Sequence, residues 1–117
     1  MEIRQIKELL SADLIVGEET LDKDVHSACG SDMMSDVLAY VKDQAVLLTG
    51  LVNAQVIRTA QMMDMICIVF VRSKRPSEDM IELARDAGIT LMSTSKRMYE
   101  ACGLLYTAGL GNGVAHE

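Results

Sequence analysis

The chain has few aromatic residues, no cysteine pairs at close spacing and no long apolar runs. Only 3% of its 117 residues are Phe, Trp or Tyr, and Trp is absent, although 50% of the residues are hydrophobic and nine are Met. A core built from such residues is aliphatic and sulfur-rich, and therefore adaptable in shape. No apolar run reaches the roughly 18 residues that a membrane span needs. We therefore expect no membrane partner.

The three cysteines, Cys29, Cys67 and Cys102, form an odd set without a Cys-x-x-Cys motif. We interpret them as reduced structural thiols, which are typical of a reducing compartment. The amino terminus is amphipathic and charged, unlike a signal peptide. These features predict a cytoplasmic protein, and a chain of this length can bury a core without disulfides.

The net charge of −6 argues against non-specific binding of nucleic acid. The charge is unevenly distributed along the chain. Residues 1–43 contain ten acidic and four basic residues, giving −6, whereas residues 44–117 contain seven of each. Two short segments hold five of the eleven bases, namely Arg72, Lys74, Arg75, Lys96 and Arg97. Such segments are either solvated loops or parts of an anion-binding site.

An unbroken, mostly β-branched apolar run at residues 66–71 predicts a strand that is buried on both faces. Other apolar patterns predict strands at 14–16, 25–29, 45–49 and 89–92, and helices at 3–11, 32–42, 54–63, 77–87 and 96–106. From residue 45 onward strands and helices alternate, as in βαβ units with parallel pairing. The sequence predicts a three-layer α/β sandwich with a mostly parallel central sheet.

These elements predict a single domain over residues 1–108. Residues 109–117 are rich in glycine and predict a flexible tail. The spaced glycines of this tail follow no strand and open no helix, so they do not match a dinucleotide-binding fingerprint.

Three loops are expected together at one edge of the sheet, because parallel strands end on the same side. Each loop leads into the amino terminus of a helix, where free N–H groups and the helix dipole favour an anion. The candidate ligand-binding residues are Gly50, Asn53, Arg72, Ser73, Lys74, Arg75, Thr94, Ser95 and Lys96. The expected ligand is a nucleotide-like or phosphorylated small molecule. The alternative is that the polar side chains only cap helices.

No catalytic residue, metal site or cofactor is predicted. The loops lack the Gly-Lys-Ser/Thr ending of a P-loop. Cys29 precedes a predicted helix start, where its pKa could be lowered, and His26 is close to it in the sequence. However, the only other histidine is His116, and no second ligand pair or Ser-His-Asp set is evident. A small thiol enzyme using Cys29 and His26 is therefore the weaker alternative to a non-enzyme.

Methionine is more abundant than one small core requires. Exposed Met-rich surface commonly pairs with another chain. The residues concerned are Met33, Met62, Met63, Met65 and Met80. We therefore expect a homodimer, and a pure interaction domain without a small ligand is the alternative to a ligand sensor.

Residues 30–38, which read Gly-Ser-Asp-Met-Met-Ser-Asp-Val-Leu, and Leu48-Thr49-Gly50 with the strand–loop–helix units after it resemble the DRTGG domain family. That family is similar to the amino-terminal domain of HPr kinase/phosphorylase. It also occurs within some phosphate acetyltransferases and between CBS domains in some pyrophosphatases. The resemblance covers residues 1–107, so the chain looks like a free-standing copy.

This resemblance implies a regulatory or ligand-sensing module, often in a multimeric context. Kinase activity is not implied, because the P-loop domain of the kinase is absent from the sequence. The Asp-Arg-Thr-Gly-Gly signature is not present as written, since residues 50–53 read Gly-Leu-Val-Asn. The resemblance therefore says little about which residues bind a ligand.

Overall fold

The computed structural model describes residues 1–40 and 44–111, and its centre is the strand β4 (Cys67–Phe70). All four residues of β4 are buried. The sheet has five strands in the order β1-β5-β4-β3-β2, so β4 is the middle strand. The predicted central strand, buried on both faces, is confirmed.

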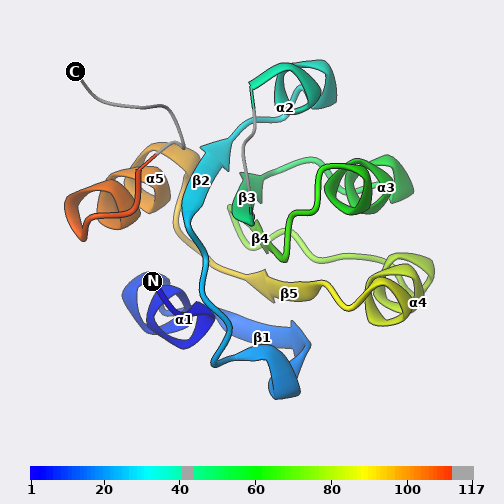
Figure 1. Ribbon diagram of the computed structural model, residues 1–117, viewed down its shortest axis with the longest axis horizontal. Coiled ribbons are helices and arrows are strands. Elements are labelled where there is room, and N and C mark those ends of the chain that lie inside the picture. Colours follow the sequence, from blue (N-terminus) through cyan, green and yellow to red (C-terminus); the bar gives the residue numbers. More distant parts are fainter. Residues whose placement is uncertain (41–43, 112–117) are drawn as a thin grey trace.

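Four of the strands are parallel. They are β2 (Ser27–Gly30), β3 (Ala45–Thr49), β4 and β5 (Thr90–Ser93). The connecting helices are α2 (Met34–Tyr40), α3 (Ala54–Met62) and α4 (Glu78–Ala87). These helices all lie on one face of the sheet (Figure 1), because successive strands are neighbours and their crossovers have the same hand.

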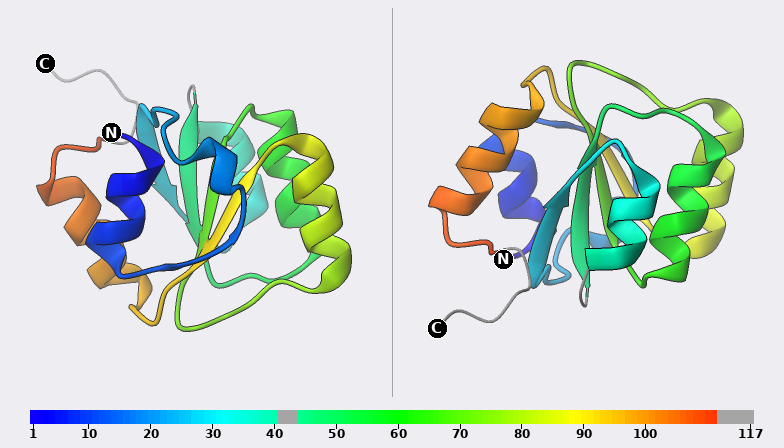
Figure 2. Two further views of the ribbon diagram at one scale, coloured as in Figure 1. Left: turned by 90° about the horizontal axis from the view of Figure 1, so that it is seen from below. Right: turned by 90° about the horizontal axis from the view of Figure 1, so that it is seen from above.

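The opposite face is covered by the two helices near the chain ends, α1 (Ile3–Leu10) and α5 (Met98–Thr107) (Figure 2). The buried stripe of α1 consists of Ile3, Ile6 and Leu10, which recur at helical spacing. The helices therefore form two outer layers around the sheet. The predicted three-layer α/β sandwich is confirmed.

The strand β1 (Asp13–Val16) is antiparallel to β5 and forms one edge of the sheet. After the short 3-10 helix η1 (Glu18–Thr20), the chain crosses to β2 at the other edge. Because β1 runs against its neighbour, its first residue, Asp13, pairs with Ser93 at the end of β5. The start of β1 thus joins the loops at the carboxyl edge of the parallel strands.

Alternating side chains divide the core into two layers. In β4, Cys67 and Val69 pack in the first core layer, against α1 and α5. Ile68 and Phe70 pack in the second core layer, against α2, α3 and α4. All four side chains are fully buried. This two-sided burial explains why the strand sequence shows no polar alternation.

The expectation of a methionine-rich surface needs correction. Met65 and Met80 are buried in the second layer, and Met63 packs against that layer. Met33 and Met62 are 61% and 68% exposed. Flexible thioether side chains thus fill gaps in the core as well as covering the surface.

The carboxyl-terminal segment is ordered further than the sequence predicts. Leu110 is buried in the first core layer, and the carbonyl of Gly111 accepts a hydrogen bond of 2.8 Å from the N–H of Ala28. Within the expected tail, Leu110 and Gly111 thus contact the rest of the domain, and residues 112–117 lie outside the described residues. No helix in the described ranges is long and apolar enough to span a bilayer.

We predict that Phe70→Ala lowers the free energy of unfolding by about 3–5 kcal/mol, because it leaves a large cavity in the second core layer. Urea unfolding followed by circular dichroism measures the change. Met62→Ala, at an exposed helix position, is the control and should change stability by less than about 0.5 kcal/mol. Similar losses for both variants would contradict the assigned core.

Candidate anion-binding site

The loops after β4 and β5 are joined through their backbones. The N–H of Arg72 donates to the carbonyl of Lys96 at 2.9 Å, and the N–H of Ser73 donates to the carbonyl of Thr94 at 2.8 Å. These bonds continue the contact between the two strands beyond the edge of the sheet. The loops therefore hold a fixed position relative to each other.

Arg72 and Ser73 both have left-handed backbones, with φ of 56° and 58°. This conformation costs a non-glycine residue about 1–2 kcal/mol. The two hydrogen bonds to the loop after β5 help to hold it in place. Backbone strain of this kind is concentrated at functional sites, where it fixes the direction of side chains.

A hollow of about 460 Å³ lies between the two loops and is lined by Arg72, Ser73, Ser95 and Arg97. Among residues 1–40 and 44–111, neither arginine takes part in an ion pair. Two guanidinium groups and two hydroxyls thus share one concave surface. Guanidinium groups bind phosphate and carboxylate oxygens through paired, charge-assisted hydrogen bonds.

The loop after β3 determines where Arg72 lies. A Cβ atom at Gly50 would collide with the Arg72 guanidinium, so this side chain lies directly over the glycine backbone. The N–H of Gly50 and the hydroxyl of Thr49 both donate to Asp32 Oδ1, at 2.7 and 3.0 Å. The Asp32 carboxylate thus links the segment after β2 to the end of β3.

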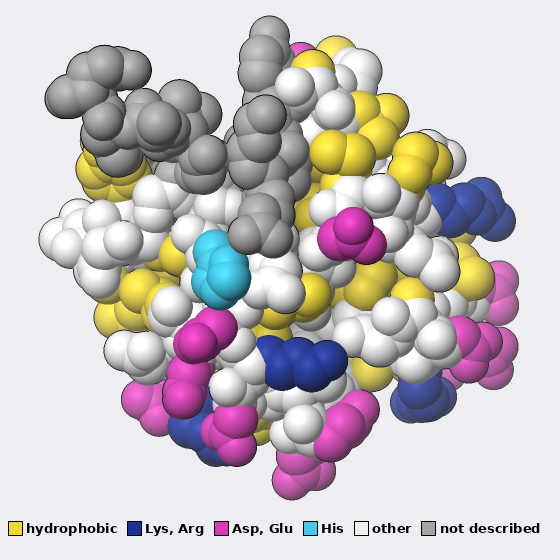
Figure 3. All heavy atoms as spheres, in the orientation of Figure 1, with side chains coloured by type: hydrophobic (Ala, Val, Ile, Leu, Met, Phe, Trp, Pro, Cys, Tyr) yellow, Lys and Arg dark blue, Asp and Glu magenta, His cyan; other side chains and the backbone are white. Residues whose placement is uncertain are grey.

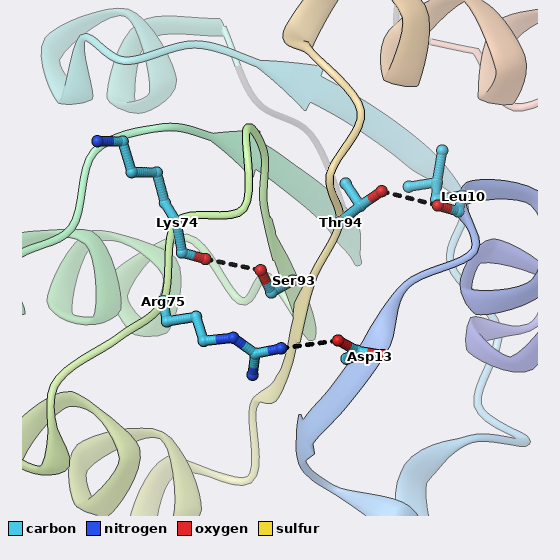
Figure 4. A network of polar contacts seen from close by, with 6 residues as sticks. All are labelled: Leu10, Asp13, Lys74, Arg75, Ser93 and Thr94. Atoms are coloured by element: carbon cyan, nitrogen blue, oxygen red, sulfur yellow. Dashed lines mark hydrogen bonds and ion pairs between the residues drawn. The ribbon is translucent and has the colours of Figure 1, made fainter.

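Two predicted site residues have structural contacts instead (Figure 4). Thr94 is 2% exposed and donates a hydrogen bond of 2.7 Å to the carbonyl of Leu10. Arg75 forms an exposed ion pair of 2.7 Å with Asp13 at the start of β1. Both contacts fasten α1 and β1 to the carboxyl edge. Neither residue lines the hollow.

The other predicted residues do not line the hollow either. Asn53 caps α3, since its side-chain oxygen accepts a hydrogen bond of 3.3 Å from the N–H of Val56. Lys96 Nζ lies 3.7 Å from a carboxylate oxygen of Glu100. The Lys74 side chain points away from the contacts drawn in Figure 4. The helix-capping alternative thus accounts for Asn53.

Arg97 is one of the clustered bases of the sequence but is not among the predicted ligand-binding residues. In the structure it is the N-cap residue of α5 and makes no side-chain capping bond. Its guanidinium therefore takes no part in capping the amino terminus of α5. The sequence signal that could have identified Arg97 as a ligand-binding residue is its position at a helix start. A short side chain with an oxygen atom is usual there, whereas Arg97 is long and always charged.

A lowered pKa of Cys29, on which the weaker thiol-enzyme alternative depends, is not found. Burial raises the pKa of this thiol, and the neighbouring Cys102 and Asp36 raise it further. Cys29 lies within β2 and not at the start of α2, so no helix dipole stabilises its thiolate. In the described part of the chain, no group of three or more His, Cys, Asp or Glu side chains could hold a metal ion.

These features define the class of protein as a three-layer α/β domain with a cationic, hydroxyl-lined hollow at the carboxyl edge of its sheet. The model of the DRTGG domain family matches residues 5–108. The chain therefore belongs to the DRTGG domain family, which confirms the resemblance seen in the sequence. No curated protein matches the chain.

The fold is similar to a solved structure of the CBS and DRTGG domains of the regulatory region of Clostridium perfringens pyrophosphatase, complexed with the activator diadenosine tetraphosphate. The TM-score is 0.71 and the sequence identity is 18%, over 96% of this chain and 48% of that chain. The chain thus spans about half the length of that structure. With a sequence identity of 18%, the similarity shows a shared fold alone.

We predict that Ser73→Gly raises the free energy of unfolding by up to about 1 kcal/mol, because glycine adopts a positive φ without strain. Thermal or urea unfolding measures the change. The matched control is Ser95→Gly, at a residue without positive φ. It should lower stability by some tenths of a kcal/mol, since it mainly adds freedom to the unfolded chain. Equal changes in the free energy of unfolding of the two variants would contradict backbone strain at Ser73.

We also predict that Cys29 and Cys102 react slowly with iodoacetamide at neutral pH. Burial raises the pKa of both thiols, so less reactive thiolate is present there than in a free cysteine. The rate should rise as the pH is increased through and beyond the ordinary thiol range. Mass spectrometry of the alkylated peptides measures it, with unfolded protein as the fast reference. Selective fast labelling of Cys29 would instead favour the thiol enzyme.

Proposed function

We propose that this DRTGG domain is a non-catalytic regulatory module that senses a small anionic ligand at the carboxyl edge of its sheet. The observation that carries the proposal is the hollow in which Arg72 and Arg97 lie without an acidic partner among the described residues. Two unpaired guanidinium groups on one concave surface attract an anion. The site offers no nucleophile with a base beside it, which favours binding over catalysis.

The lining residues favour a phosphate-bearing ligand. Arg72 and Arg97 can each donate two hydrogen bonds to one phosphate group, and Ser73 and Ser95 can donate one each. The hollow is large enough for a small metabolite or part of a nucleotide. The pyrophosphatase region with the same fold binds diadenosine tetraphosphate as an activator. We therefore propose a nucleotide or a phosphorylated metabolite as the ligand.

The position of the hollow suits a regulatory role. A bound anion would link the loop before α4 to the loop before α5. Through Arg72, which lies over Gly50, it would also be connected to the loop after β3 and to the hydrogen bond from Gly50 to Asp32. Ligand binding could then change the order of several loops at once. We place this module in the cytoplasm, where its three free cysteines would stay reduced.

A second proposed function is association with another chain, including homodimerisation. Hydrophobic side chains gather over α2 and α3 at the upper right of Figure 3. The exposed large hydrophobic residues of α2, of α3 and of the position before α2 are Leu38 at 42%, Met62 at 68% and Met33 at 61%. A regulatory module needs a surface through which its state reaches another protein or domain. Clustered apolar side chains of this kind are typical of such contacts.

We predict that the protein binds nucleotides or phosphorylated metabolites with an affinity that depends on Arg72 and Arg97. Isothermal titration with ATP, diadenosine tetraphosphate and inorganic phosphate measures it. Arg72→Ala with Arg97→Ala should weaken binding by about 100-fold or more, since each charge-assisted contact contributes about 1.5–3 kcal/mol. The matched control is Arg58→Ala with Arg85→Ala, which removes the same charge from exposed helix positions and should leave binding nearly unchanged.

Gly50→Ala gives a second test without loss of charge. The added methyl group must displace the Arg72 guanidinium, a flexible group, so folding should be preserved while ligand binding weakens. If the wild-type protein binds none of these compounds at millimolar concentration, ligand sensing is refuted. Association with another chain then remains as the proposed function. Equal loss in the control double variant would mean that binding follows net charge only.

A further inference from the structure

The helix α5 is apolar on nearly all sides. Ala101 and Leu105 are buried against the sheet, whereas Tyr99 and Tyr106 are 92% and 64% exposed. A carboxylate oxygen of its one acidic residue, Glu100, lies 3.7 Å from Lys96 Nζ. A helix that is hydrophobic all round is normally covered all round. Among residues 1–40 and 44–111, the outer side of α5 therefore lacks the covering that its composition favours.

Beside α5 lies a hollow of about 370 Å³, bounded by this helix and the edge strand β2. Its lining is largely apolar and includes both exposed tyrosines, together with Ala28, Gly30, Leu48, Cys102 and Leu110. The N–H of Ala28 on this edge already donates to the carbonyl of Gly111. An occupant would therefore pack through side chains and would not extend the sheet as an added strand.

Gly103 lies between the two tyrosines, in the interior of α5. It is exposed, and a Cβ atom there would meet nothing within 4 Å. Glycine destabilises a helix interior relative to alanine, and contacts within the protomer do not require it here. The missing side chain would, however, allow a second helix to approach closely at this point.

We propose that two copies of the chain pair through α5, about a two-fold axis near Gly103. A two-fold interface must be self-complementary, and this surface carries two exposed rings together with the hollow that they help to line. Where two antiparallel helices cross at Gly103, Tyr99 of one protomer lies beside Tyr106 of the other. The inference rests on the homodimerisation of the proposed function and assigns it to α5, which leaves the α2–α3 surface for association with a different chain.

Electrostatics favour this face for a second copy. With a net charge of −6, two identical chains repel each other. Exposed acids are concentrated along the connection from β1 to β2, where Figure 3 shows them at the bottom of the molecule; they include Glu18, Glu19, Asp22 and Asp24. The helix α5 has one acidic residue, Glu100, with Lys96 beside it, so it presents less charge to a copy of itself. Exposed tyrosines are also enriched at protein interfaces.

Substitution of Gly103 by alanine tests the proposal because its effects on folding and pairing have opposite signs. Gly103→Ala should raise the melting temperature of the dilute protomer, since alanine favours the helix and clashes with nothing in the protomer. It should weaken self-association, because the methyl group separates the crossing helices. Sedimentation equilibrium measures the dimer dissociation constant, and circular dichroism measures melting.

Tyr99→Ala with Tyr106→Ala should raise the dimer dissociation constant at least about tenfold, the size of effect typical of central interface aromatics. The melting temperature of the dilute protomer should change little, because both rings are exposed. The matched control, Glu82→Ala with Arg85→Ala, removes two exposed side chains of α4 without a change in net charge and should leave pairing unchanged.

The outcomes separate this inference from the proposed function. A wild-type protein that stays monomeric at high concentration would overturn both the homodimer and the α5 interface. A dimer that is unaffected by the Gly103 and tyrosine variants would overturn the α5 interface alone. Ligand binding is measured separately at Arg72 and Arg97, so neither outcome decides it.

Discussion

Burial of the parallel strands on both faces is the constraint on which the rest of this structure depends. A strand such as β4 has no solvent face, so both of its sides need a covering layer. The crossovers place α2, α3 and α4 on one side, and the helices near the chain ends, α1 and α5, cover the other. Polar groups are then excluded from the strands and gather where the strands end. The position of the candidate site follows from the packing of the core.

At that edge, burial separates structural hydroxyls from those available to a ligand. Thr94 is turned inward to the carbonyl of Leu10, and Ser93 is turned to the carbonyl of Lys74 at 2.7 Å. Both bonds satisfy backbone groups near the core, as buried polar atoms require. Ser73 and Ser95 are exposed, and they lie beside arginines that have no acidic partner in the described chain. Neighbouring residues of similar chemistry thus have different roles.

This division also explains how far the sequence could predict the structure. The runs at residues 45–49 and 66–71 carry strong periodic signals, so the strands and the three-layer fold were predicted well. Thr94 and Ser95 look alike in sequence, because only the arrival of α1, 84 positions away along the chain, decides which hydroxyl is buried. The bond from Gly50 to Asp32 and the antiparallel pairing of β1 are likewise long-range features. Local patterns contain no signal for such contacts.

The two proposed surfaces meet on a single element. Arg97, which lines the cationic hollow, is the N-cap residue of α5, and Tyr99 follows in the first turn of the same helix. A helix transmits a shift of its first turn along its whole length because its backbone bonds are continuous. An anion held by Arg97 would therefore bias the position of the surface around Gly103. If it favours the paired arrangement, thermodynamic reciprocity requires that pairing strengthens anion binding by the same factor. One rigid helix would then couple ligand sensing to assembly.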